Sequence, residues 1–352
     1  GWGTAGLPQG GGERVGKPYT VRDGAHTVEL LRFALGPDDA AAREWSARQQ
    51  PLTLFYIDGA STIDSADAKW EVVVALETDR EGRRSLVGFT TVYSFYAFPD
   101  KTRLRLSQLL VLPPFRRQGH AAALMKAVKQ LALARDCIDV TYEDPTDELQ
   151  RMREAEDVRA ALTCPELRQA AEGAVAAAQA APTPAECRSA LAAPTPDSAA
   201  RAAAVKQLKL CKPQIRKVWE ALLFIVARQK QVPLTSPAVT AFQEIVRRRL
   251  RTSVGGDMRR DARGKSVVNT GPDRDSRDFV MMKGGGRVPG QLVPSGFDMD
   301  VGKENESDDE EDEGQTNGQK AGEGARTPEE LLKELFAEEM DKLAYLARKC
   351  LA

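Results

Sequence analysis

The sequence predicts an α/β fold of the α+β type, in which a mixed, mostly antiparallel sheet with flanking helices precedes a small helical domain. Three observations predict this class. Segments rich in β-branched, aromatic and aliphatic residues follow one another between residues 52 and 112, as in a meander. After Gly119 the apolar spacing becomes helical, and residues 138–142 return to a strand pattern. Between residues 208 and 250 the large apolar residues again recur at helical spacing.

Composition narrows the class of protein. The chain has 352 residues, enough for two domains at about 150 residues each. Its formal net charge of −1 excludes whole-chain affinity for nucleic acid. Five scattered cysteines without a CxxC pair indicate neither a disulfide framework nor a metal site, and they favour a reducing compartment. Because no apolar run reaches transmembrane length and no signal peptide opens the chain, we expect a soluble intracellular protein that contacts no membrane.

The first domain is expected over residues 17–165, after a glycine-rich segment at 1–16 that we expect to be disordered. Its predicted elements are, in order, a strand at 26–35, a helix at 37–49, strands at 52–57, 70–76, 86–98 and 104–112, a helix after Gly119, a strand at 138–142 and a helix from 144 to Pro165. The last strand, helix and strand of the sheet form a β-α-β unit that closes it.

The rest of the chain is expected to be helical with two interruptions. Residues 166–205 are rich in Ala and Pro without periodic large apolar residues, which predicts a loose insertion. Residues 206–251 predict a helical domain. Residues 252–327 contain an acidic block at 304–313 and predict a disordered loop. A final helix at 328–352 carries an apolar face that needs a partner surface.

The segment with the most specific chemistry is the strand at 106–112 and the loop that follows it to Ala121. Gly119 at the junction of loop and helix lets the backbone approach a ligand closely. The unsatisfied N–H groups of the first helical turn, reinforced by the helix dipole, form an anion site that suits a pyrophosphate. The pattern R-x-x-G-x-A from Arg116 to Ala121 is short, and by itself it also fits an ordinary strand-to-helix connection.

In its context, this pattern resembles the acyl-CoA-binding motif of the GNAT (Gcn5-related N-acetyltransferase) superfamily. Within that superfamily, residues 96–125 followed by 139–146 resemble the catalytic subunits of type B histone acetyltransferases, and residues 57–70 resemble the segment before the second long strand of that family. Arg116 stands where the family usually has glutamine, and Ala121 stands where it has glycine.

Other parts of the chain depart from the family. We expect the domain to be truncated at its N-terminal part, because the sequence starts at Gly1 without an equivalent of the family's N-terminal subdomain. The insertion at 166–205 and the acidic loop are not features of the family either.

The resemblance implies acetyl-CoA as co-substrate and no metal. The backbone residues expected to pair with the pantetheine amides are Leu109, Leu110 and Val111. The residues expected to wrap the pyrophosphate are Arg116, Arg117, Gln118, Gly119, His120, Ala121 and Ala122. His120 is expected to begin the helix rather than to take part in catalysis.

The resemblance also places a general base at Glu143, with Asp144 and Asp58 as reserve carboxylates. A free lysine has a pKa of about 10.4, so a base has to take its proton before the amine can attack a thioester. From the residues alone, Glu143 could be a solvated strand end, Asp144 a helix N-cap before Pro145, and Asp58 a turn residue before Gly59.

Four residues match the family positions that line the groove for the aliphatic part of a target lysine. They are Trp70, Tyr93, Ser94 and Phe95. The alternative interpretation is an ordinary strand core, which is the usual role of alternating aromatic residues.

The function implied is transfer of acetyl from acetyl-CoA to a lysine of a free, newly synthesised histone of the H-four type, by general-base catalysis in a ternary complex. The implied partner is a WD-repeat histone-binding subunit, and the implied location is nuclear and cytoplasmic. Arginines between 247 and 265 form a basic cluster that we interpret as a solvated helix end rather than a nucleic-acid site. Two alternatives stay open, namely a small-amine N-acetyltransferase and a non-catalytic histone-binding scaffold.

Overall fold

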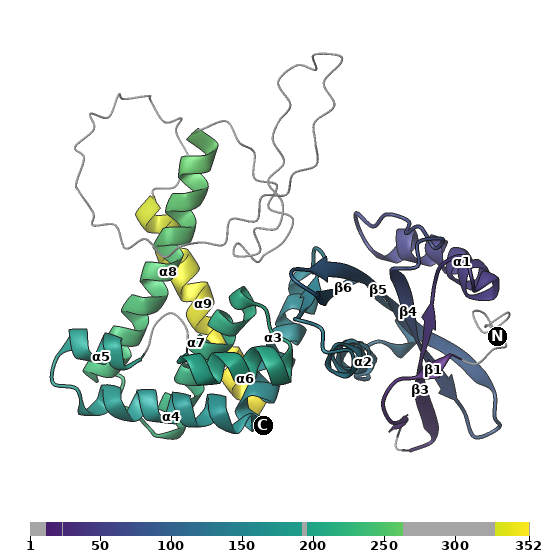
Figure 1. Ribbon diagram of the computed structural model, residues 1–352. Helices are drawn as coiled ribbons and strands as arrows, with labels where there is room; N and C mark the ends of the chain where they lie inside the picture. The colour runs from purple at the N-terminus through teal and green to yellow at the C-terminus, as the bar shows by residue number, and fades with distance from the viewer. Residues whose placement is uncertain (1–11, 23, 192–195, 263–327, 352) are drawn as a thin grey trace, which may run out of the picture.

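The computed structural model describes residues 12–22, 24–191, 196–262 and 328–351. Within them, a mixed sheet with a helix on each face stands beside a larger group of helices (Figure 1). This arrangement confirms the predicted fold class.

The sheet has the strand order β1-β3-β4-β5-β6-β7, with β2 paired to β3. The elements of this domain are β1 (Glu13–Arg14), β2 (Tyr19–Val21), β3 (His26–Ala34), α1 (Ala40–Tyr56), β4 (Trp70–Thr78), β5 (Arg84–Ala97), β6 (Lys101–Val111), α2 (His120–Ala134) and β7 (Val140–Tyr142). Neighbouring strands are antiparallel except β6 and β7, which are parallel. The predicted β-α-β unit is therefore β6-α2-β7.

Alternation along the central strands divides the core between the two faces of the sheet. On one face, Val72 of β4 packs in the same cluster as Trp45 of α1, whose side chain is fully buried. On the other face, Val73 packs with Leu124 of α2. Because β4 is covered on both faces, it reads as a nearly continuous apolar run, as sequences of doubly covered strands do.

The second group is a helical domain with a core of its own. Its helices are α3 (Asp147–Thr163), α4 (Pro165–Ala180), α5 (Pro184–Ala190), α6 (Ser198–Leu208), α7 (Lys212–Gln229), α8 (Pro237–Ala262) and α9 (Pro328–Leu351). Trp219 of α7 is buried at its centre. Helix α9 packs against α3, α7 and α8 and buries Leu343 and Ala347, which supplies the predicted partner surface. None of the described helices is both long and apolar enough to cross a membrane.

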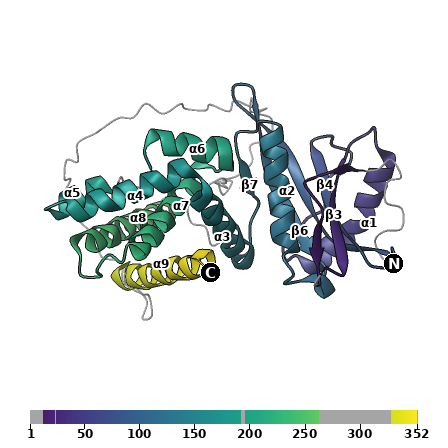
Figure 2. The same cartoon turned by 90° about the horizontal axis from the view of Figure 1, so that it is seen from below.

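The helical domain lies on the β7 side of the sheet (Figure 2). The carbonyl of Lys209, just after α6, accepts a hydrogen bond from the Val140 N–H at 3.0 Å, and the Gln214 side chain donates to the Val140 carbonyl at 3.2 Å. The outer edge of β7 is therefore held by the helical domain, which fixes the strand that precedes Glu143.

The predicted strand at 52–57 is wrong, because residues 52–56 continue α1. Trp45, Gln49 and Thr53 are buried at intervals of four, which puts them on one helical face toward the sheet, while Phe55 is 80% exposed. Tertiary packing of that face outweighs the local β preference of these residues and the proline at position 51.

The predicted loose insertion at 166–205 is also wrong, because most of it forms α4, α5 and α6. Small side chains, among them Ala171, Ala178 and Ala204, are buried in the helical core and let the helices approach closely. A search for periodic large residues misses a face made of alanine. Residues 192–195 of this segment lie outside the described residues.

Two predicted boundaries need correction. Residues 12–16 were expected to be disordered, but β1 pairs with β3 and Val15 is buried in the core. Helix α8 extends to Ala262, past the predicted end at 251. The rest of the predicted loop, including the acidic block at 304–313, lies outside the described residues.

A buried carboxylate on β4 links this strand to β3 and to the end of α2. Glu71 of β4 is 6% exposed and accepts hydrogen bonds from Arg135, at the end of α2, at 2.7 and 2.9 Å, and from Arg32 of β3 at 2.5 Å. Burial acts to raise the pKa of Glu71, but the hydrogen bonds from Arg135 and Arg32 outweigh it and hold this pKa below its ordinary value.

We predict that Glu71→Gln lowers the free energy of unfolding at pH 7 by about 3 kcal/mol, because it leaves Arg135 without its charge partner and Arg32 with only the exposed Glu13. The carboxylate contributes fully above its unfolded pKa of about 4.3, and this contribution is lost as pH falls through the lower folded pKa. Denaturant titrations of parent and variant should therefore converge in acid. Glu44→Gln, which removes an exposed i,i+4 pair with Arg48, is the control and should change little. Equal stability of parent and Glu71→Gln at pH 7 would contradict the prediction.

Candidate functional site

Strands β6 and β7 diverge after a short pairing. Leu104 to Leu106 pair with Val140 to Tyr142, and the Glu143 N–H donates to the Leu106 carbonyl at 2.9 Å. Strand β6 continues to Val111, paired on its other side with β5. Within the part of the chain that the structure describes, no strand pairs with β6 beyond Leu106 on the β7 side. The result is a gap between two strands with one polar backbone edge.

A β-bulge lies at the start of this gap. Leu106 is opposite Val92 and Leu109 is opposite Thr90, so Ser107 and Gln108 together face a single residue of β5. The extra residue bends β6 and changes which backbone groups face its neighbours.

Beyond the bulge, backbone groups alternate between β5 and the gap. The Leu112 N–H donates to the Val87 carbonyl in β5 at 2.9 Å. By antiparallel alternation, Leu110 also bonds toward β5, whereas Leu109 and Val111 direct their N–H and C=O groups toward the gap. Of the three residues predicted to pair with pantetheine, Leu109 and Val111 have the required orientation. Leu110 does not, because the bulge fixes the alternation.

The loop after β6 ends in an open helix start. A short 3₁₀ turn at Pro113–Phe115 leads to Arg117 and Gly119, which have positive φ angles of 61° and 89°. Gly119 is the N-cap of α2 and makes no side-chain capping bond. A Cβ at this position would meet nothing within 4 Å. The first N–H groups of α2, at residues 120–122, are therefore open to an anion.

Two side chains of this loop fold back onto the protein. Arg116 donates from Nε to the Val111 carbonyl at 3.1 Å and lies over the Tyr56 ring at 5.8 Å. Gln118 donates to the Pro114 carbonyl at 3.2 Å. The Arg116 and Gln118 side chains are therefore bonded within the protein, and the predicted loop offers its backbone N–H groups to a ligand. Arg116 links the end of β6 to α1. Tyr56 was not predicted to be near this loop, because residues 52–57 were interpreted as a strand.

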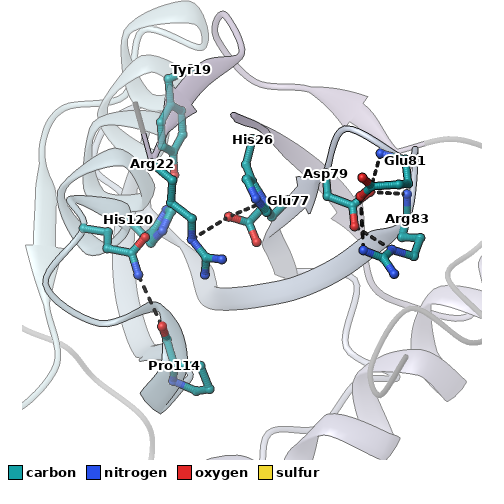
Figure 3. A network of polar contacts seen from close by, with 10 residues as sticks. Tyr19, Arg22, His26, Glu77, Asp79, Glu81, Arg83, Pro114 and His120 are labelled. Carbon is teal, nitrogen blue, oxygen red and sulfur yellow. Dashed lines mark hydrogen bonds and ion pairs between the residues drawn. The ribbon is translucent and has the colours of Figure 1, made fainter. Parts of the chain in front are cut away.

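The imidazole of His120 is buried at the start of α2, in the group of polar residues around Tyr19 and Arg22 (Figure 3). It is 1% exposed, and its Nδ1 lies 2.8 Å from the Tyr19 hydroxyl. Burial lowers the pKa of His120. The negative charge of Glu77 partly offsets this decrease, and the positive charge of Arg22 adds to it. The side chain supports the first turn of α2 from inside the protein, where its ring packs edge-on against Phe115 of the loop at 6.4 Å between centroids. The backbone N–H of His120 still belongs to the open helix start.

Glu143 follows β7 directly and is exposed at the gap. The Ser107 hydroxyl donates a hydrogen bond to Oε2 of this carboxylate. The side chain predicted as base is therefore anchored to the bulge of β6, next to the edge formed by Leu109 and Val111.

The two reserve carboxylates have different surroundings. Asp144 is exposed and has a positive φ of 35°. The N-cap of α3 is Thr146, which accepts from the Leu149 N–H at 3.3 Å, so the interpretation of Asp144 as the cap is wrong. Asp58 is exposed in the turn after α1, beside Gly59 with φ of 71°, as the alternative interpretation expected.

Three of the four predicted groove residues come together. Trp70 and Tyr93 are cross-strand partners with ring centroids 4.8 Å apart, and Phe95 lies 4.6 Å from Tyr93. The Tyr93 hydroxyl donates to Asp67 at 3.0 Å. Ser94 lies between the two aromatic residues of β5, so its side chain points to the opposite face of the sheet.

Besides Ser107, the polar residue Gln108 was not predicted as part of the site. Gln108, 6% exposed, donates to the Ser61 carbonyl at 2.8 Å and accepts from the Thr91 hydroxyl at 3.3 Å. It holds the segment after α1 onto β6. The signal was the adjacent Ser107 and Gln108 inside an otherwise aliphatic strand end. Among the described residues, no group of His, Cys, Asp and Glu is arranged to hold a metal ion.

Comparisons with known proteins agree with this geometry. Residues 39–152 match the model of the acetyltransferase (GNAT) family. The chain is similar to histone acetyltransferase type B catalytic subunits: 35% identical over 133 residues to that of Arabidopsis thaliana (37% of this chain, 28% of the relative), and 31% identical over 201 residues to that of Zea mays (56% and 42%). It is also 38% identical over 116 residues to the Rattus norvegicus subunit (32% of this chain, 28% of the relative). The chain thus spans less than half the length of each of these relatives.

We predict that Gly119→Asp weakens CoA binding at least tenfold, as measured by calorimetry, since it puts a side chain and a negative charge where the pyrophosphate would lie, on a left-handed backbone that costs a non-glycine residue ~1–2 kcal/mol. The matched control is Gly82→Asp, because Gly82 also has a positive φ of 77° and open space around its Cα. Unchanged CoA affinity in a folded Gly119→Asp variant would place the anion site elsewhere.

Proposed function

We propose that this protein, in which residues 39–152 form an acetyltransferase domain of the GNAT fold, transfers acetyl from acetyl-CoA to a lysine side chain of free histone of the H-four type. One observation carries the proposal: an exposed carboxylate, Glu143, stands where β6 and β7 diverge, beside a free strand edge that leads to an open helix start. The similarity to type B histone acetyltransferase subunits supports histone as the substrate class.

The residues present fit acetyl-CoA. The N–H groups of Leu109 and Val111 and the Leu109 carbonyl match the amide groups of an extended pantetheine arm, as an added strand would, while the Val111 carbonyl already accepts from Arg116. The open N–H groups at 120–122 match a pyrophosphate, and the absence of a side chain at Gly119 lets that group come close. The order of these features along β6 and α2 is the order of the groups along the co-substrate.

The chemistry follows from the protonation state of the acceptor. A lysine ammonium has no lone pair and loses its proton with a pKa of about 10.4, so Glu143 accepts this proton directly or through one water. The neutral amine then attacks the thioester carbonyl carbon, a C–N bond forms, and the C–S bond breaks. The departing thiolate takes up the second proton that the nitrogen loses, which gives the amide and the CoA thiol. No covalent acyl-enzyme is needed.

The predicted groove residues and the exposed carboxylates of the site offer contacts to a basic peptide. Trp70, Tyr93 and Phe95 offer partly exposed rings that can contact the aliphatic part of a lysine. Asp58 and Asp144 are exposed carboxylates of the predicted site. Negative charge near the groove raises the encounter rate with a positively charged tail. The proposal also includes a WD-repeat partner subunit and a nuclear and cytoplasmic location. Both rest on the family resemblance alone.

We predict that Glu143→Gln lowers the acetylation rate on a histone tail by about 10²- to 10⁴-fold, the usual effect of removing a positioned base. Acetyl-CoA affinity should be nearly unchanged, because the amide keeps the size and the hydrogen bond from Ser107. The assay uses radiolabelled acetyl-CoA with free core histones and, in parallel, polyamines. Glu172→Gln, an exposed carboxylate on α4, is the control.

Three other outcomes would contradict parts of the proposal. Near-parent activity of Glu143→Gln, with a large loss in Asp144→Asn or Asp58→Asn, would move the role of base to that carboxylate. Acetylation of polyamines but not histones would indicate a small-amine acetyltransferase. Histone binding without any turnover by the parent would indicate a scaffold.

A further inference from the structure

We infer that Ser107 is a positioning residue, which holds the Glu143 carboxylate in the orientation that receives the proton of the substrate. This inference rests on the proposed function, since it concerns how the proposed base is held. Two consecutive residues of β6 carry it. The Leu106 carbonyl binds the backbone N–H of Glu143 at 2.9 Å, and the Ser107 hydroxyl binds its side chain.

The bulge makes the Ser107 hydroxyl available for this contact. Ser107 and Gln108 share one position opposite Thr91, where a regular strand would place one residue. Gln108 takes the contacts with the neighbouring strand and loop, accepting from the Thr91 hydroxyl and donating to Ser61. Ser107 is half-buried at the edge of the gap, with its hydroxyl toward the end of β7.

Glu143 needs such an anchor because its side chain is exposed and lies beyond the last paired residue of β7. A free glutamate has three rotatable side-chain bonds, and ordering it has an entropic cost. A hydrogen bond to a charged carboxylate offsets this cost better than one to a neutral group. Ser107 binds Oε2, which leaves Oε1 to accept the proton from the amine.

The contact assigns Ser107 no chemical step of its own. Its hydroxyl keeps its proton and donates it in a hydrogen bond, while the proton of the amine moves to Glu143. The expected defect of a variant without the hydroxyl is therefore a slower chemical step, with the co-substrate site intact.

The test compares Ser107→Ala, Ser107→Thr and the parent on free histone. Ser107→Ala should lower kcat about tenfold to a hundredfold, the range expected for loss of a hydrogen bond to a charged group. The KM for acetyl-CoA and the affinity measured by calorimetry should stay unchanged. Ser107→Thr should keep most of the activity, because threonine retains the hydroxyl and suits a strand. Ser85→Ala, a half-buried serine of β5 far from the bulge, is the matched control.

A double variant separates a positioning role from a merely structural one. If Ser107 acts through Glu143, adding Ser107→Ala to Glu143→Gln should cause little further loss of kcat. A full additional loss in the double variant, or unchanged kcat in Ser107→Ala, would overturn the inference. Near-parent activity of Glu143→Gln would instead move the role of base to another carboxylate, and a parent that does not acetylate histone would overturn the proposed function, so these failures are distinct from a failed Ser107 test.

Discussion

The divergence of β6 and β7 is the constraint on which the rest of the site depends. The hydrogen bond from Glu143 to the Leu106 carbonyl is the last backbone link that we describe between the two strands, and the bulge begins one residue later. From that point one strand offers a free backbone edge and the other ends in a carboxylate. A regular, fully paired β6 and β7 would leave neither a binding edge nor an exposed base.

The helical domain contributes to this geometry from the other side. Strand β7 is only three residues long, and its pairing with β6 alone would hold it weakly. The Lys209 carbonyl and the Gln214 side chain bind Val140 from the outer edge, so β7 is held between the sheet and the helices. This explains why an otherwise separate core is packed beside the domain that carries the predicted chemistry.

The sequence predicted elements well where apolar periodicity and local signals agree, as in β3 to β6, α2 and α7. It failed at residues 52–57 and 166–205, where packing of one helical face and burial of alanine decide the structure. Glu143 and Gly119 were predicted as site residues because they lie in short motifs that resemble those of a known family. The role of Ser107 could not be predicted, because it depends on the register between β5 and β6, which only the folded sheet defines.

The most direct test of the central claim is amide hydrogen exchange at single-residue resolution along β6, with and without saturating acetyl-CoA. If the free edge binds the pantetheine arm, the Leu109 and Val111 amides should exchange more slowly in the complex. The Leu110 amide faces β5 and should be slow in both states. Unchanged exchange at Leu109 and Val111 in a protein that demonstrably binds acetyl-CoA would contradict the account.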